Sequence, residues 1–297
     1  MACYSDEVVP GNALSHDNRR KVWVIYVSFL EFGPLVLQHE DAWLCVMVKR
    51  SCDIAKVAAG ISQVFAATLK FFFGGSGCDL SVGGMVLQMP DSSKHRLFCK
   101  LAMVLQDGGA QKHVWCNKGE AGTKLCMLCR NLMSEKSNLV GEDGEDILTC
   151  SIVHEADLDF ATDDDIKGTV ARLAADKPVL SAKLFQLREQ AVGFKYEQHG
   201  LLWDQALHHV LNPATQFCHD WMHTFFVGGV FQTVMTLLWQ AMTAAGFTNF
   251  YEQLYDYVGM WQLPKAFTNS SLQDVFPRKD MTQTRRLNPS SALPVKA

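Results

Sequence analysis

Two cysteines and two histidines have the spacing of zinc ligands. Cys126 and Cys129 are two residues apart in Cys126-Met-Leu-Cys129, which lets both thiolates reach one tetrahedral ion at about 2.3 Å. His219 and His223 lie at i and i+4 in a segment expected to be helical, so both rings would project from one face. A closed four-ligand site is structural, because catalytic zinc keeps one position open. The sequence therefore predicts a structural zinc ion held by Cys126, Cys129, His219 and His223.

Other residues and simpler explanations compete with this zinc site. A cysteine pair can be ordinary apolar core in a reduced protein, and histidines near a helix start can be satisfied by hydrogen bonds. Several residues can replace one ligand: Cys99, Cys116, Cys218, His208 and His209. The sequence contains no His-Glu-x-x-His zinc motif, phosphate-binding loop, nucleophile elbow or dinucleotide fingerprint. Nucleotide hydrolysis and esterase activity are therefore not expected.

Two aspartates lie where an apolar run meets a turn. Asp6 is followed by Pro10-Gly11, and Asp107 by Gly108-Gly109. If the two runs are neighbouring strands, the carboxylates converge and offer the oxygen ligands that Mg²⁺ or Mn²⁺ prefers. Such ions activate water for attack at phosphorus. Either aspartate can instead be only a turn former, so adjacency of the strands decides between the two explanations.

The first part of the chain, which must position these residues, has a pattern of predicted strands and helices that is typical of an α/β fold. Apolar and β-branched runs predict strands at Cys3–Asp6, Lys21–Leu30 and Ala42–Lys49, with a turn at Glu31–Pro34. Three- and four-residue spacing predicts a helix over Ile54–Phe73, ended by Gly74-Gly75. Met85–Met89 and Arg96–Gln106 predict a hairpin whose second arm is a buried strand ending at Asp107.

The rest of the chain is predicted to be mainly helical. Gly141–Asp146 is expected to be a solvent loop, and Asp163–Asp165 to cap a helix over Ile166–Ala175 rather than to bind metal. Further helices are predicted at Ala182–Ala191, Leu201–Leu211, Ala214–Ala245 and Phe250–Trp261. We therefore expect four segments: 1–135, the first part of the α/β core; 136–212, an insertion of loop and helices; 213–263, C-terminal helices packing back on the core; and 264–297, a polar tail or linker.

Composition limits the compartment and the partners. With 297 residues and 48% hydrophobic composition the chain can bury a large core. A net charge of −4 restricts any DNA binding to a local contact. Ten cysteines without an N-terminal signal segment indicate a nuclear or cytoplasmic protein that is not secreted. The apolar run Thr224–Ala245 is expected to be a core helix, with a membrane anchor as the alternative, and a homo-oligomer is possible.

The order of the motifs resembles that of several eukaryotic DDE/D cut-and-paste DNA transposases. Leu105-Gln-Asp107-Gly-Gly-Ala is followed by Lys118-Gly-Glu-Ala-Gly-Thr-Lys124 and by the cysteine pair. His219-Asp-Trp-Met-His223 resembles the downstream histidine pair that completes the zinc site in CACTA-like and RAG-like members. The resemblance runs from about Cys3 to Gly229. It implies an RNase H-like mixed sheet with a largely helical insertion and C-terminal helices, the first acid ending strand one and the second ending strand four.

The same resemblance implies roles for individual residues. Asp6 would be the first catalytic carboxylate and Asp107 the second, with Mg²⁺ or Mn²⁺ as the catalytic ion and zinc as the structural one. The third acid is expected at Glu252, with Asp256 as the other candidate, although both also suit a solvated helix face. Such enzymes carry a preceding DNA-binding domain, so the chain is expected to be truncated.

Two functions remain as alternatives. An intact enzyme would hydrolyse a DNA strand at a transposon end, and the freed 3′-hydroxyl would attack target DNA. Three lysines after Asp107 are candidates for phosphate contacts, although a solvated loop explains them equally well: Lys112, Lys118 and Lys124. A catalytically inactive copy would instead persist as a zinc-stabilised scaffold or interaction protein.

Overall fold

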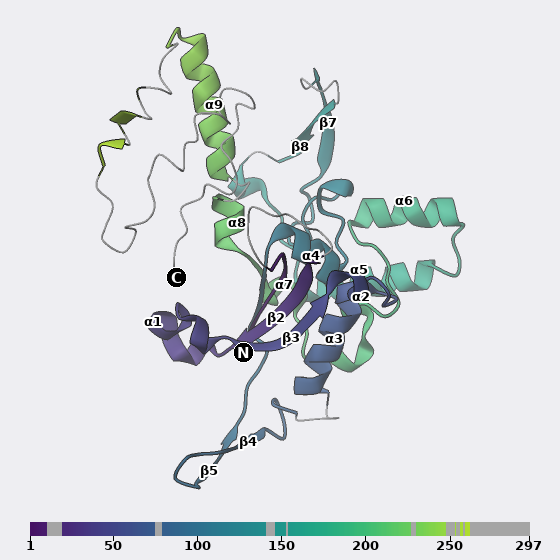
Figure 1. Cartoon of the computed structure of the whole chain (residues 1–297). Helices are drawn as coiled ribbons and strands as arrows, with labels where there is room; N and C mark the ends of the chain where they lie inside the picture. The colour runs from purple at the N-terminus through teal and green to yellow at the C-terminus, as the bar shows by residue number, and fades with distance from the viewer. Residues whose placement is uncertain are drawn as a thin grey trace. The chain divides into compact units, whose positions relative to one another are not determined.

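The computed structural model describes residues 1–10, 20–74, 79–140, 146–152, 154–226, 230–247, 253, 256–257 and 259–261 (Figure 1). The chain divides into two compact units, Met1–Cys218 and His219–Ala297. The first unit contains nearly all of the strands, and the second begins with the last residue of a short strand and continues into helices. The division into four segments stays a prediction.

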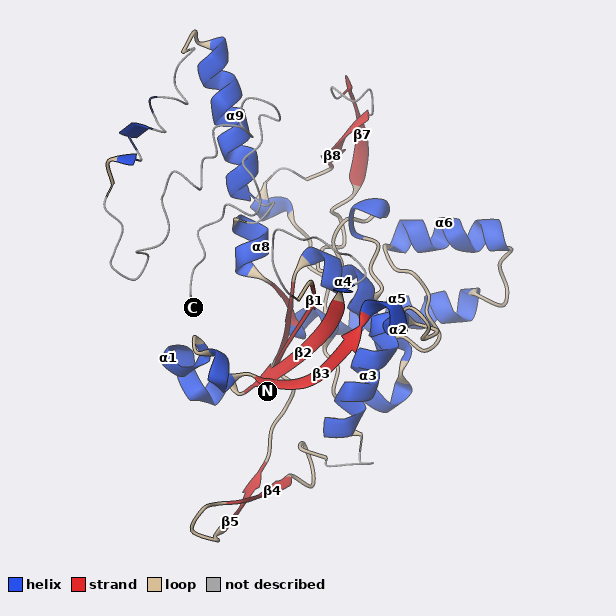
Figure 2. Cartoon of the chain, viewed as in Figure 1, coloured by secondary structure: helices blue, strands red, loops and turns tan. Residues whose placement is uncertain are grey.

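A five-stranded sheet organises the first unit (Figure 2). Its strands are β1 (Ala2–Val8), β2 (Val22–Ser28), β3 (Leu44–Arg50), β6 (Met103–Gln106) and β9 (Phe217–His219). Their order across the sheet is β3-β2-β1-β6-β9. β1 is antiparallel to β2 and β2 to β3, whereas β1 and β6 are parallel. A mixed sheet with surrounding helices confirms the predicted α/β class.

One face of the sheet is buried by helices. Every second residue of β2 on this face is at most 5% exposed: Trp23, Ile25 and Val27. These alternate residues form the face of the strand that meets the core, and Val24 and Ser28 on its other face are buried as well. Helices α3 (Gly60–Phe73) and α4 (Gly108–Trp115) contribute apolar side chains to the same cluster, among them Phe65, Leu69, Val114 and Trp115. The core therefore lies between the sheet and this helical layer.

Two connections in the first half differ from the sequence prediction. The helix expected over Ile54–Phe73 is divided into α2 (Ser51–Ile54) and α3. Gly60 has a φ of 54°, a conformation that glycine adopts without a steric penalty, so the chain changes direction before α3. The turn expected at Glu31–Pro34 is longer and helical, with η2 (Leu30–Phe32), α1 (Gly33–Leu37) and η3 (Glu40–Ala42).

The hairpin predicted between Met85 and Gln106 was partly wrong. β4 (Met85–Gln88) pairs with β5 (Lys94–Leu97) in a separate antiparallel ribbon. The charged side chains of β5 are exposed, so this strand cannot be the buried arm. That arm is β6, which lies in the main sheet with Val104 fully buried.

Helices α5 and α6 follow the ribbon of β7 (Ser134–Val140) and β8 (Asp146–Cys150). Of the predicted loop Gly141–Asp146, residues 141–145 lie outside the described residues, and Asp146 is the first residue of β8. After η5 (Glu155–Asp157), α5 (Asp163–Asp176) begins with a capping box in which Thr162 and Asp165 bond each other's backbone N–H. The three aspartates therefore lie in the first turn, as an acidic helix start requires, but the helix begins three residues earlier than predicted and its N-cap is Thr162. α6 (Ala182–Val192) is found as expected. The helix expected over Leu201–Leu211 was wrong, since η6 (Leu201–Trp203) and η7 (Gln205–Leu207) replace it.

The long helix predicted over Ala214–Ala245 was also wrong. The segment contains α7 (Pro213–Gln216), β9, α8 (Trp221–Phe225) and α9 (Val230–Ala244). Asp220 ends the extended segment and caps α8, its Oδ1 accepting a hydrogen bond from the Met222 N–H at 2.8 Å. Across the described residues, no helix has both the length and the apolar character needed to span a membrane. Most of the helix expected over Phe250–Trp261, and the whole tail 264–297, lie outside the described residues.

Candidate active site

Asp6 and Asp107 lie on neighbouring parallel strands. Tyr4 is paired with Leu105 and Ser5 with Gln106 in the ladder between β1 and β6. One further step along both strands reaches Asp6 and Asp107, and adjacent strands are about 4.8 Å apart. Asp6 lies inside β1 rather than at its end, because pairing with β2 continues to Val8. The two strands that precede Asp6 and Asp107 are therefore neighbours, as the acid-pair prediction required. The predicted end of the first strand at Asp6 was wrong, because β1 continues to Val8.

The Asp6 carboxylate accepts hydrogen bonds from a side chain and a backbone N–H of its own strand. The Tyr4 hydroxyl donates to Oδ2 at 3.1 Å, and the Glu7 backbone N–H donates to Oδ1 at 2.7 Å. Successive side chains of a strand point to opposite faces, and Ser5 is fully buried on the helix-covered face. Tyr4 and Asp6 therefore project from the other face, where Asp6 is half-buried.

Asp107 is the N-cap of α4. Its Oδ1 accepts a hydrogen bond from the Ala110 N–H at 2.6 Å, which satisfies one amide of the first helical turn. Its Oδ2 has no hydrogen bond to any described residue. The turn-forming role and the ligand role are thus compatible, because each uses a different oxygen of the carboxylate.

A buried polar network lies directly behind the two acids. Gln106 is fully buried, and its side-chain Nε2 donates to the Ser5 Oγ at 2.5 Å while its Oε1 accepts from the Trp115 indole N–H at 2.9 Å. Gln111 Nε2 donates to the Gln106 carbonyl at 3.3 Å and to the Cys218 carbonyl at 3.1 Å. These contacts join β1, β6, β9 and α4. Sequence reasoning missed the network, and its only signal was a polar Gln106 inside an otherwise apolar strand.

The third acid is not located. Glu252 lies outside the described residues, and Asp256 belongs to the second unit, whereas Asp6 and Asp107 belong to the first. Within the part of the chain that the structure describes, no three His, Cys, Asp or Glu side chains gather as metal ligands do. The roles of Asp6, Asp107 and Glu252 therefore stay predictions.

Cys126 and Cys129 lie in a loop with their thiols side by side. Cys129 is buried, and burial, followed by the neighbouring Cys126 thiol, raises its pKa to about 11. Two adjacent thiols of this kind are a donor set that suits zinc, which binds them as thiolates and offsets their mutual repulsion. Cys116, one of the alternative ligands, is instead buried at the end of α4, where burial raises its pKa to about 11.

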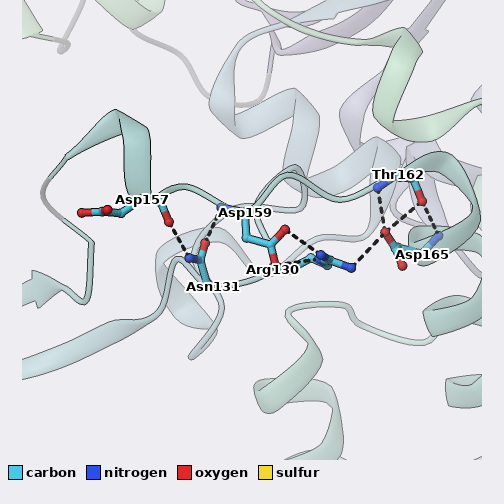
Figure 3. A network of polar contacts seen from close by, with 6 residues as sticks. All are labelled: Arg130, Asn131, Asp157, Asp159, Thr162 and Asp165. Atoms are coloured by element: carbon cyan, nitrogen blue, oxygen red, sulfur yellow. Dashed lines mark hydrogen bonds and ion pairs between the residues drawn. The ribbon is translucent and has the colours of Figure 1, made fainter.

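The loop that carries the cysteines is fixed to the segment before α5. Cys129 forms a β-bridge with Phe160, and the Ala161 N–H donates to the Leu128 carbonyl at 2.8 Å. Figure 3 shows the adjoining polar contacts, in which the Arg130 guanidinium binds both carboxylate oxygens of Asp159, at 2.9 and 2.7 Å. Their other members are Asn131, Asp157, Thr162 and Asp165. The geometry of the cysteine loop is therefore set by backbone pairing and a bidentate ion pair.

His219 and His223 are not on one helix, so the i, i+4 argument for this pair was wrong. His219 ends β9 and His223 lies in α8, because Asp220 starts a new helix between them. The His223 Nδ1 lies 2.6 Å from Asp220 Oδ2. A carboxylate on one ring nitrogen is the arrangement that orients a metal-binding histidine through its other nitrogen. Both histidines belong to the second unit and both cysteines to the first, so their convergence on one zinc ion stays a prediction.

The lysines that follow Asp107 have local partners. Lys112 pairs with Glu120, and Lys118 Nζ lies 3.7 Å from Glu189 Oε2. Lys124 is half-buried, and burial lowers its pKa although the nearby cysteine thiols oppose the change. A cavity of about 450 Å³ beside the C-terminal end of α4 has a lining of two kinds. Small and apolar residues of 55–61 form one part, and the other part includes Lys112, Lys118, Lys195 and the acidic Glu197.

Comparison of the chain with protein-family models, curated proteins and solved structures finds no match. The assignment of the site therefore depends on its own geometry. Within that geometry, the strongest feature is that Asp6 and Asp107 directly follow Ser5 and Gln106, the last paired residues of the β1–β6 ladder, with a buried network behind them.

Proposed function

We propose that this chain derives from the catalytic core of a cut-and-paste DNA transposase with an RNase H-like fold. The sheet order β3-β2-β1-β6-β9, antiparallel on one side of β1 and parallel between β1 and β6, supports this proposal. β6 is the fourth strand of this sheet in chain order. The second acid follows it directly, as the resemblance to DDE/D enzymes implies.

The observation that carries the proposal is the position of Asp6 and Asp107 one step beyond the paired residues Ser5 and Gln106. Mg²⁺ or Mn²⁺ bound there would activate water and stabilise the oxygen leaving phosphorus. The donor set fits such an ion, because both ligands are carboxylates and Asp107 Oδ2 is not used by the helix cap. Tyr4 and the Glu7 N–H fix the orientation of the Asp6 carboxylate toward this side of the sheet.

In the proposed reaction, the chain orients a water molecule for attack on a phosphodiester at the transposon end. The DNA 3′-hydroxyl that is released then attacks a target strand. DNA contact would be local, since the chain carries a net charge of −4. A phosphate at the cavity beside α4 would compete with Glu120 and Glu189 for Lys112 and Lys118. The nucleus is the compartment in which this reaction would take place.

We also propose that zinc stabilises the protein through Cys126, Cys129, His219 and His223. The adjacency of the two thiols and the Asp220 contact to His223 support this assignment. Zinc held in this way would contribute folding free energy and no chemistry.

The test of the proposed activity is nicking of an end-labelled DNA duplex in the presence of Mg²⁺ or Mn²⁺. Asp6→Asn and Asp107→Asn should each abolish nicking, because an amide is a poor ligand for these ions, while the shape of each side chain is kept. Asp91→Asn is the matched control, since Asp91 is an exposed turn residue that accepts only local bonds from Ser93. Nicking that survives Asp107→Asn would contradict the catalytic role of this residue.

A second candidate function is a catalytically inactive, zinc-stabilised scaffold that retains the fold as an interaction protein. The observation that favours it is the helix-capping role of Asp107, which gives the residue a purpose without catalysis. This candidate predicts one equivalent of zinc, no nicking with either ion, and no change of either result in Asp107→Asn.

A further inference from the structure

The spacing of the two acids depends on the residues immediately before them. Ser5 precedes Asp6, Gln106 precedes Asp107, and these two buried residues are paired in the β1–β6 ladder. Their side chains also bond each other, since Gln106 Nε2 donates to Ser5 Oγ at 2.5 Å. The two strands are thus joined by a side-chain bond at the last step before the acids.

Gln106 is held in one orientation by its remaining contacts. Its Oε1 accepts from the Trp115 indole at 2.9 Å, so the amide oxygen and nitrogen cannot exchange positions without losing both bonds. Its backbone carbonyl accepts from Gln111 at 3.3 Å. Trp115 and Gln111 are both on α4, the helix whose first turn is capped by Asp107. One residue therefore connects β1, β6 and the helix that fixes the second acid.

We propose that Ser5 and Gln106 are positioning residues that set the register of β1 against β6 and so the separation of the Asp6 and Asp107 carboxylates. This inference rests on the proposed function, because it assigns the purpose of the network to the metal site in front of it. Ligands of a metal site must be held to within about 0.5 Å of the productive geometry by groups behind them. A parallel pair without this bond would keep its backbone ladder but would hold the carboxylates less rigidly.

Two independent features favour this role over simple core stability. An apolar pair at these positions would fill the same space without leaving polar groups to satisfy, and buried polar groups are costly unless every partner is present. In addition, the network lies one residue behind both acids, whereas two other buried serines bond groups away from them: Ser62 bonds the Val114 carbonyl and the Leu201 N–H, and Ser28 bonds the Ala42 carbonyl.

Manganese binding to the full chain tests the inference. Mn²⁺ affinity is measured by electron paramagnetic resonance of the free ion, which requires no DNA and no turnover. The wild-type chain should bind Mn²⁺, and Asp6→Asn and Asp107→Asn should each abolish this binding. Ser5→Ala should raise the Kd for Mn²⁺ roughly tenfold, the lower end of the loss seen when groups that orient metal ligands are removed.

Ser62→Ala is the matched control. Ser5 and Ser62 are both fully buried. The Ser62 hydroxyl makes two hydrogen bonds to backbone groups, whereas the Ser5 hydroxyl accepts one from Gln106, so Ser62→Ala should lose at least as much stability as Ser5→Ala. Only Ser5→Ala should weaken Mn²⁺ binding. Trp115→Phe is a second test, because it keeps an aromatic ring but removes the N–H that donates to Gln106. It should raise the Kd for Mn²⁺ by a smaller factor than Ser5→Ala does.

The outcomes separate the inference from the proposed function. If the wild-type chain shows no Mn²⁺ binding that depends on Asp6 and Asp107, the proposed function fails. If binding depends on the acids but Ser5→Ala and Ser62→Ala change the Kd equally, or neither changes it, the positioning role is overturned while the proposed function stands.

Discussion

Replacement of Asp107 by alanine and by asparagine should separate its two roles. Asp107 caps α4 through a 2.6 Å hydrogen bond from the Ala110 N–H and places a carboxylate at the positive end of the helix dipole. Loss of an N-cap side chain costs about 1 kcal/mol, and loss of the charge near the dipole about 0.3–1 kcal/mol. Asp107→Ala loses both contributions, so its free energy of unfolding should fall by about 1–2 kcal/mol.

Asparagine is as good an N-cap as aspartate, so Asp107→Asn should lose only the charge contribution, less than about 1 kcal/mol. Urea unfolding followed by circular dichroism measures the difference between the two variants, and the DNA nicking assay measures the chemistry. We expect unequal stabilities but equal loss of nicking. Equal destabilisation by the two substitutions would refute the capping argument, and nicking by the asparagine variant alone would refute the ligand argument.

Three further predictions follow from the surrounding structure. Gln106→Leu removes the hydrogen-bond partner of the Ser5 hydroxyl and of the Trp115 N–H, which costs about 1–3 kcal/mol for each group. The free energy of unfolding measured in urea should therefore fall by about 2–6 kcal/mol. A fall below about 0.5 kcal/mol would contradict a stabilising role of the network. Cys126→Ser should remove zinc, measured by atomic absorption, and lower the Tm sharply, and an unchanged melting curve would eliminate the zinc site. Burial alone would raise the pKa of Asp163, but hydrogen bonds from Thr215 and the backbone lower it below the ordinary value of 3.8. The lowered pKa stabilises the folded protein above pH 3.8, and this stabilisation is lost as the pH falls through the folded-state pKa. Asp163→Asn should therefore lose less stability than the wild type between pH 5 and pH 2, measured by thermal unfolding, and parallel profiles would show that this carboxylate does not contribute.

The elements around the acid pair were predictable because their signals are local. β2 carries apolar residues at four of its five buried positions, the exception being Ser28, and Gly108-Gly109 after β6 marks the end of that strand. The pairing of β1 with β6 was expected only through the resemblance to a known strand order, since Asp107 follows Asp6 by 101 positions. Register between such distant strands is set by tertiary packing, which no short window of sequence contains.

The prediction failed where one apolar run contained several elements. Ala214–Ala245 has few charged residues and no proline after its start, so it resembles one buried helix. Asp220 breaks the run by capping a new helix, and residues 217–219 are extended because they pair at the edge of the sheet. Strand pairing of this kind overrides local helical propensity. The inferred geometry of the His219 and His223 pair failed for the same reason.

The double use of the Asp107 carboxylate affects how related copies of this gene would be interpreted. Under the proposed function, a copy that has lost DNA cleavage would still need aspartate, asparagine, serine or threonine to begin α4, so retention of the acid there is poor proof of activity. Asp6 lies inside β1 and begins no helix; its carboxylate accepts hydrogen bonds from the Tyr4 hydroxyl and the Glu7 N–H. Under the proposed function, replacement of Asp6 with Asp107 still in place would therefore mark a copy that has lost DNA cleavage.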